Sequence, residues 1–252
     1  MTTKSELVEL QQTLYISKNL TRRWLHCTRR DWIINKIQAI VANKQHNRAL
    51  EVGPGSGIYL PILAELFEQV TASDVEYAYL KYASNLREMY SNLSFIVDDI
   101  TNTKLPDASF DLILCTEVIE HIADSISAIA GMHRLLKPGG LLILSTPQRW
   151  SPLELMAKIA FMPGIIDLVR LIYREPILET GHINLMTSEE VVRQLESVGF
   201  HICERFKSGM YLPFIAEFGG KIGLNFERWL ESKIINGAID WLLWTQYYIV
   251  EA

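Results

Sequence analysis

Three side chains with catalytic potential lie close together near the middle of the chain. The run Thr116-Glu-Val-Ile-Glu-His121 places Glu117, Glu120 and His121 three and four positions apart. If this run forms a helical turn, the three side chains share one face. Two carboxylates and an imidazole can bind a divalent cation such as Mg²⁺, Mn²⁺ or Zn²⁺, or the imidazole can act as a general base. The structural alternative is that Glu120 and His121 only pair and pack with their neighbours.

A glycine-rich stretch, Arg48-Ala-Leu-Glu-Val-Gly-Pro-Gly-Ser-Gly57, precedes this run. It predicts a short buried strand that Glu51 closes, then a tight turn, then a helix over 58–68. The turn carries glycine at every second position: Gly53, Gly55 and Gly57. This spacing suits a backbone that passes close to a ligand, where any Cβ would collide. A dinucleotide fingerprint would need glycine at position 58, which is isoleucine.

Further strands must position these residues in space. The pattern predicts them at residues 69–73, 93–97, 111–115, 141–145, 201–206 and 245–250, with helices between them. Such alternation is typical of a parallel sheet with right-handed crossovers. Asp74 ends the second strand, where an acid can accept hydrogen bonds from both hydroxyls of a ribose. It can also cap the helix that follows.

The Glu-x-Gly-x-Gly-x-Gly turn, and the Lys137-Pro-Gly-Gly140 turn with the helix before it and the apolar strand over 141–145 after it, resemble the class I S-adenosylmethionine-dependent methyltransferases, over about residues 45–207. The resemblance implies a Rossmann-like, seven-stranded, mostly parallel sheet whose last strand is antiparallel. Helices would cover both faces, with helical insertions after strands 5 and 6. The implied cofactor is S-adenosylmethionine, with S-adenosylhomocysteine as product. Its implied ligands are Glu51, Gly53, Gly55, Gly57, Asp74, Asp99, Ile100, Thr116 and Glu117.

The Glu-x-x-Glu-His run most closely resembles the corresponding run of two subgroups: the O-methyltransferases of ubiquinone biosynthesis and the RNA 3′-terminal 2′-O-methyltransferases. Both carry a further histidine beyond the fifth strand, and His182 stands where that residue is expected. The resemblance therefore implies a metal site formed by Glu117, Glu120, His121 and His182. His121 would assist loss of the acceptor's proton, directly or through that metal.

Composition limits the classes of partner. The chain has 252 residues, 49% of them hydrophobic, and a net charge of -5, which gives no overall basic footprint for a nucleic acid. Its three cysteines have no metal-type spacing and predict no disulfide framework, which fits a reducing cytoplasm. The first ten residues do not predict a secretory signal, and no apolar run predicts a membrane-spanning helix.

We expect one methyltransferase domain over 1–252. Its parts would be N-terminal helices (1–44), a cofactor-binding core (45–147), a helical insertion or lid (148–180), and the end of the sheet (181–252) with an apolar insertion over 208–244. The first insertion can cover an apolar substrate or touch a membrane surface through 151–175; alternatively, its two helices only cover each other. Seven aromatic residues of the second insertion can line a pocket with it: Tyr211, Phe214, Phe218, Phe226, Trp229, Trp241 and Trp244.

The leading function is O-methylation of a small lipophilic or phenolic acceptor. RNA terminal methylation is one alternative, a cofactor-binding protein without catalysis is another, and a nicotinamide enzyme is the most distant. The acceptor and the oligomeric state are not predicted. Four arginines flank the aromatic positions of the N-terminal helix, and we assign them no role in the site: Arg22, Arg23, Arg29 and Arg30.

Overall fold

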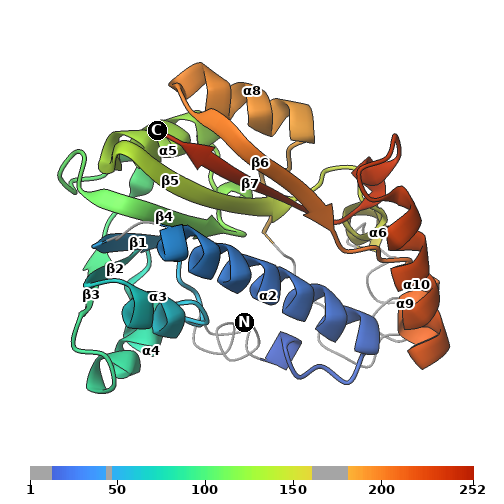
Figure 1. Ribbon diagram of the computed structural model, residues 1–252. Helices are drawn as coiled ribbons and strands as arrows, with labels where there is room; N and C mark the ends of the chain where they lie inside the picture. Colours follow the sequence, from blue (N-terminus) through green and yellow to red (C-terminus); the bar gives the residue numbers. More distant parts are fainter. Residues whose placement is uncertain (1–12, 44–46, 161–180) are drawn as a thin grey trace.

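The computed structural model describes residues 13–43, 47–160 and 181–252. At its centre lies a seven-stranded sheet in the order β3-β2-β1-β4-β5-β7-β6 (Figure 1). The strands are β1 (Arg48–Val52), β2 (Gln69–Asp74), β3 (Leu93–Val97), β4 (Phe110–Thr116), β5 (Leu136–Pro147), β6 (His201–Ser208) and β7 (Thr245–Glu251). β7 runs antiparallel to β5 and β6, and the other pairings are parallel. The predicted sheet, including its antiparallel last strand, is confirmed.

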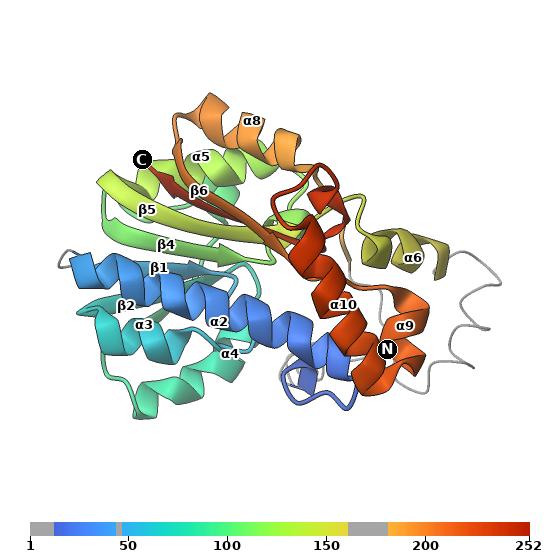
Figure 2. The ribbon, with the colours of Figure 1, turned by 45° about the vertical axis from the view of Figure 1, so that its right-hand side comes forward.

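Two helical layers enclose the sheet (Figures 1 and 2). On one face lie α2 (Leu20–Asn43), α3 (Leu60–Leu66) and α4 (Tyr77–Ala83), and on the other lie α5 (Ser125–Leu135) and α8 (Ser188–Val198). The first layer buries apolar side chains such as Ile33 and Leu63 against the sheet, and the second buries Ile129 and Leu195. Both faces of the central strands are therefore covered, which explains why β4 reads as a continuous apolar run.

Local sequence signals define where the helices begin and end. The carboxylate of Asp124 accepts a hydrogen bond from the amide of Ser127 at the start of α5. Thr187 and Glu190 form the predicted capping box of α8, and Gly199 ends that helix with a left-handed φ of 111°. Short 3-10 turns follow two of the strands, η2 (Ile100–Asn102) after β3 and η3 (Ile119–His121) after β4; of two others, η1 (Ser84–Glu88) follows α4 and η4 (Asp240–Leu242) precedes β7.

The predicted insertions after strands 5 and 6 contain helices. After β5 comes α6 (Pro152–Ala160), and residues 161–180 of the same insertion lie outside the described residues. After β6 come α9 (Pro213–Phe218) and α10 (Gly220–Ile234), which pack beside the start of α2 at one end of the molecule (Figures 1 and 2). Within the described ranges, none of the helices is both long enough and apolar enough to cross a membrane.

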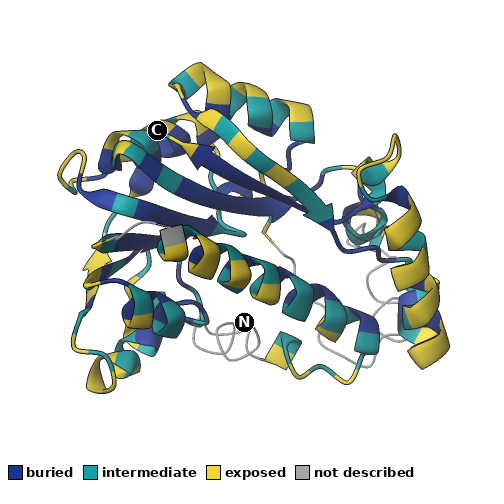
Figure 3. Cartoon of the chain, in the orientation of Figure 1, coloured by how far each residue is buried: buried dark blue, intermediate teal, exposed yellow. Residues whose placement is uncertain are grey.

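The aromatic residues of the second insertion divide into two groups. Tyr211 and Trp244 are buried, as expected for the wall of a pocket or for a core. The other five are exposed on the outer surface: Phe214, Phe218, Phe226, Trp229 and Trp241. Figure 3 shows this exposed outer side of α9 and α10. In the described part of the chain, these five side chains therefore do not enclose the pocket that the sequence predicted.

Candidate active site

The carboxyl ends of four neighbouring strands bring most of the predicted site residues to one edge of the sheet. Val52 of β1 lies beside Ser73 of β2 and Cys115 of β4, and Asp74 lies beside Val97 of β3. The glycine turn and the loops after β2, β3 and β4 therefore leave the sheet at the same edge. Ligands of parallel α/β sheets bind in this position.

The glycine turn after β1 has a backbone that other residues adopt only with strain. Gly53, Gly55 and Gly57 have φ values of 66°, 52° and 73°. A Cβ on Gly53 would lie 2.5 Å from Cγ2 of Val118, in the loop after β4. Glycine at this position thus permits both the left-handed turn and the close approach of the two loops.

A cavity of about 490 Å³ adjoins this turn, a size typical of small-molecule pockets. Its walls are Tyr15, Ser56, Gly57, Ile58, Pro61, Tyr82, Ala83, Asn85 and Leu86. The cavity lies against the backbone of the glycine turn, but neither Asp74 nor Thr116 contributes to its walls.

Two predicted cofactor ligands end strands and also organise their own loops. Asp74 ends β2, and its Oδ1 accepts a hydrogen bond of 2.8 Å from the amide of Glu76, before α4 begins. Asp99 follows β3, and its Oδ1 accepts from the amide and the hydroxyl of Thr101. Ile100 beside it is buried. These contacts fix both loops at the edge where the predicted ligand would lie.

The loop after β4 differs from the predicted helical turn. Glu117 has a left-handed φ of 55°, and the 3-10 turn η3 begins only at Ile119. The prediction that Glu117 shares a helical face with Glu120 and His121 is therefore wrong. Thr116, the last residue of β4, lies beside Ser145 of β5 in the sheet.

Glu117 instead forms an ion pair with the N-terminal helix. Its Oε2 accepts a hydrogen bond of 2.7 Å from Arg29, and its Oε1 accepts one of 2.9 Å from Ser145. Arg29 is buried, and its guanidinium lies over the ring of Trp244 and donates toward His26. A positive and a negative group thus lie together at the carboxyl end of β4.

Glu120 lies fully buried in η3. Its Oε2 accepts a hydrogen bond of 3.0 Å from the hydroxyl of Thr146, while its Oε1 has no hydrogen-bond partner among the described residues. Burial, with a smaller contribution from the charge of Glu117, raises the pKa of this carboxyl. The backbone carbonyl of Glu120 accepts from the amides of Ile183 and Asn184, which holds the segment beyond residue 180 against η3.

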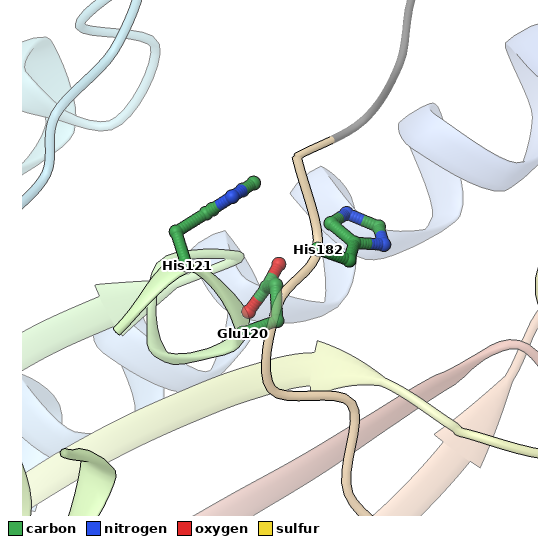
Figure 4. A group of neighbouring side chains, drawn as sticks. All are labelled: Glu120, His121 and His182. Carbon is green, nitrogen blue, oxygen red and sulfur yellow. The ribbon is translucent and has the colours of Figure 1, made fainter. Parts of the chain in front are cut away.

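Two histidines complete this group (Figure 4). One nitrogen or oxygen atom from each of Glu120, His121 and His182 lies within 4.8 Å of the others. His121 Nδ1 lies 3.1 Å from the carbonyl oxygen of Gly181, so this nitrogen must be the one that donates. His182 Nδ1 lies 3.1 Å from Oε2 of the buried Glu154. Of the four predicted metal ligands, the structure therefore groups three, and Glu117 lies outside the group.

The tautomer of His121 follows from its contact. A carbonyl only accepts, so Nδ1 of His121 carries the proton, and Nε2 of the neutral ring keeps a free electron pair. Burial lowers the pKa of His121, the Gly181 carbonyl opposes this effect, and the nearby His182 adds to it. Neutral His121 is thus favoured at physiological pH, with an unprotonated nitrogen available to a proton or a cation.

Two known proteins are similar to this chain in sequence. Over 153 residues, the chain is 28% identical to a probable S-adenosylmethionine-dependent methyltransferase of Mycolicibacterium smegmatis, covering 61% of this chain and 51% of that protein. Over 105 residues it is 34% identical to a ubiquinone biosynthesis O-methyltransferase of Pseudomonas aeruginosa, covering 40% and 45%. These matches span about half the length of each relative.

A solved structure shares the fold along the whole chain. The N-methyltransferase NodS of Bradyrhizobium japonicum, in complex with S-adenosylhomocysteine, covers 99% of this chain and 98% of its own, with a TM-score of 0.60 and 17% identity. Residues 50–144 match the family model described as a methyltransferase domain, and the chain shares the fold of the N-methyltransferase NodS. The matched residues run from β1 to β5 and include the glycine turn.

The methyltransferase cofactor fits the residues at the strand ends. Gly53, with its left-handed backbone, leaves room where a Cβ would meet Val118. The carboxyl of Glu51 is 2% exposed, and its Oε2 has no hydrogen-bond partner among the described residues. Because a buried polar atom without a partner is costly, a ligand that reaches it would be bound more tightly.

Glu51 should make the stability of the protein depend on pH. Burial raises the pKa of this carboxyl from 4.5 to about 8. The folded state therefore holds a proton that the unfolded state loses. The stabilisation of the folded state by this proton is fully present below the pKa of Glu51 in the unfolded state. It is lost as the pH rises towards about 8, at about 1.4 kcal/mol per pH unit. A Glu51→Gln variant should escape this loss. Urea unfolding of both proteins without cofactor, from pH 5 to pH 8, measures the difference; parallel curves would contradict the assignment.

Arg29 is one of the site residues that the sequence analysis missed. It follows Leu25 and precedes Ile33 at intervals of four, so it lies on the buried stripe of α2, and this spacing was the available signal.

Removing one partner of a buried ion pair, such as Arg29 with Glu117, leaves the other charge uncompensated. Arg29→Met should therefore lower the free energy of unfolding by about 3 kcal/mol. Arg30→Met, which breaks a more exposed pair with Asp31, should cost less than about 1 kcal/mol in the same urea titration. Equal losses would contradict the buried pairing.

Proposed function

We propose that this methyltransferase transfers the sulfonium methyl group of S-adenosylmethionine to an oxygen of a small lipophilic or phenolic acceptor. The observation that carries the proposal is the group formed by Glu120, His121 and His182 beside the carboxyl end of β4. Transfer to oxygen requires loss of the acceptor's hydroxyl proton, and this group contains a neutral imidazole that can receive it. The similarity to a ubiquinone biosynthesis O-methyltransferase supports the same class of acceptor.

The cofactor supplies an already activated methyl group, so the protein chiefly aligns donor and acceptor. Asp74 would accept hydrogen bonds from the ribose hydroxyls, and Asp99 and Ile100 would contact the adenine. Arg29 and Glu117 have charges complementary to the carboxylate and ammonium groups of the methionine end. Thr116 and Glu117 would therefore border the methyl group, next to His121.

The proposal also includes a divalent cation bound at this group. Glu120, His121 and His182 would hold it, since one candidate ligand atom from each lies within 4.8 Å of the others. When bound, the cation would favour the deprotonated form of the acceptor hydroxyl. Two imidazoles and one carboxylate favour Zn²⁺ or Mn²⁺ over Mg²⁺, which prefers oxygen ligands. Glu154 orients His182, as carboxylates commonly do for metal-bound histidines.

The test is a methyl-transfer assay with labelled S-adenosylmethionine. The acceptor panel contains long-chain and short-chain phenols and catechols, and a short RNA with a free 3′ end. Labelling of a phenol or catechol oxygen supports the proposal, and labelling of RNA alone contradicts it. The same assay after chelator treatment, with Zn²⁺, Mn²⁺ or Mg²⁺ restored, tests the cation; unchanged activity after full chelation would exclude it. That residues 1–252 form a single domain also remains a prediction.

A further inference from the structure

The outer sides of α9 and α10 carry exposed apolar side chains, and we name these two sides together the α9–α10 face. Its members follow one another at intervals of four, four, four and three: Phe214, Phe218, Ile222, Phe226 and Trp229. All five are exposed, and Ile222 reaches 84%. The rings of Phe226 and Trp229 stack with centroids 5.8 Å apart. Within each helix these residues stand three or four positions apart and therefore share one side, while Gly219 and Gly220, the latter with a left-handed φ of 51°, lie where the two helices meet.

On α9 and α10, the basic side chains are exposed and the acidic side chains face the protein. The three basic residues of α9 and α10 are exposed: Lys221, Arg228 and Lys233. The three acidic residues, Glu217, Glu227 and Glu231, are instead turned toward the protein and accept hydrogen bonds there. The exposed side of these two helices therefore combines aromatic residues with positive charge and presents no exposed carboxylate.

The inward-turned acids hold the two helices firmly in place. Glu217 accepts from Arg22 at 2.7 Å, and Glu227 accepts from the hydroxyl of Thr21 at 2.6 Å. Glu231 accepts from the amides of Gly209 and Met210, both at 2.8 Å. The α9–α10 face is thus a fixed surface of the folded protein. Arg22 and Thr21 belong to α2, the helix that also carries Arg29, so this helix runs from the face to the proposed site.

The geometry points to an anionic lipid surface as the partner of the α9–α10 face. Amphipathic helices with Phe and Trp on one side and Lys or Arg beside them lie in the membrane interface, where aromatic rings enter the headgroup boundary and cations meet anionic lipids. The protein as a whole carries a net charge of -5, which opposes binding to such a surface. Attachment therefore depends on this face, and it would orient the protein with α9 and α10 on the membrane.

Cosedimentation of the whole protein with lipid vesicles tests the inference. We expect binding to vesicles of phosphatidylcholine with phosphatidylglycerol, weaker binding to phosphatidylcholine alone, and weakening by salt. Lys221→Glu combined with Arg228→Glu should lower partitioning by about 30-fold or more, because each cation near an anionic surface contributes about fivefold. Ile222→Ser combined with Trp229→Ser should also abolish most binding. These side chains are exposed, so both variants should keep the unfolding curve of the wild type.

Matched controls lie on α5 and α8, which are not part of the α9–α10 face. Ile126→Ser replaces an exposed isoleucine of α5, and Arg193→Glu reverses an exposed charge of α8; both should bind as the wild type does. Vesicle binding that the α9–α10 variants leave unchanged would overturn the inference, and so would an absence of binding. Sedimentation velocity without lipid provides the remaining outcome. If the wild type self-associates and Ile222→Ser with Trp229→Ser restores the monomer, the face binds a second copy and the lipid inference fails.

Discussion

Asp74→Ala should bind S-adenosylhomocysteine about 100-fold more weakly than the wild type, as measured by titration calorimetry. Asp74 ends β2 at the edge where the glycine turn also leaves the sheet. A carboxylate there can accept hydrogen bonds from both ribose hydroxyls. Hydrogen bonds to a charged group contribute about 1.5–3 kcal/mol each, so the loss of two weakens binding by about 3 kcal/mol or more.

A second variant separates this role from a local structural one. Asp74 also accepts from the amide of Glu76, and alanine removes that contact together with the ribose contacts. Asp74→Asn keeps an acceptor for the amide but loses the charge, so it should lose about tenfold in affinity and unfold at the wild-type temperature. Asp107→Ala, on an exposed loop, should leave affinity unchanged. Affinity of Asp74→Ala within twofold of the wild type would refute cofactor binding at this edge.

Short-range signals explain why so much of the fold was predictable. The strand over Leu93–Val97 and the capping box at Thr187 appear where the sequence predicts them, because alternation, apolar runs and caps act within a few residues. The helix after the glycine turn is shorter than expected, at Leu60–Leu66. β5 is longer, from Leu136 to Pro147, because its first residues pair with β4 across a bulge.

The candidate site was less predictable because distant contacts decide its geometry. The sequence gives no local sign that Glu117 adopts a left-handed backbone, and its pairing with Arg29 joins residues that are 88 positions apart. Glu154 was also missed: its carboxylate meets His182 and Trp244, which are 28 and 90 positions away. The sequence shows only an acid on the amphipathic helix α6, and that signal does not indicate which residues Glu154 contacts.

His121→Asn should lower kcat for methyl transfer by about 10²- to 10⁴-fold, the range typical of a lost general base. The side-chain amide of asparagine can still donate to the carbonyl of Gly181, so the loop should keep its position. What the variant lacks is Nε2, which is the nitrogen that can take the acceptor's proton. The affinity for S-adenosylhomocysteine should stay within about twofold of the wild type, because His121 is not among the proposed cofactor contacts.

The pH profile distinguishes proton transfer from a packing role. A base works only when it is unprotonated, and burial holds the pKa of His121 below its ordinary 6.5. The wild type should therefore keep a constant kcat through neutral pH and lose it only as the pH falls through that lowered value. His121→Asn should lack this acidic decline, and His201→Asn, at an exposed histidine of β6, should retain both the rate and the decline. If His121→Asn kept the wild-type kcat, this imidazole would take no part in removing the proton, either directly or through a cation. Glu120 and His182 would then be the remaining members of the group that can receive the proton.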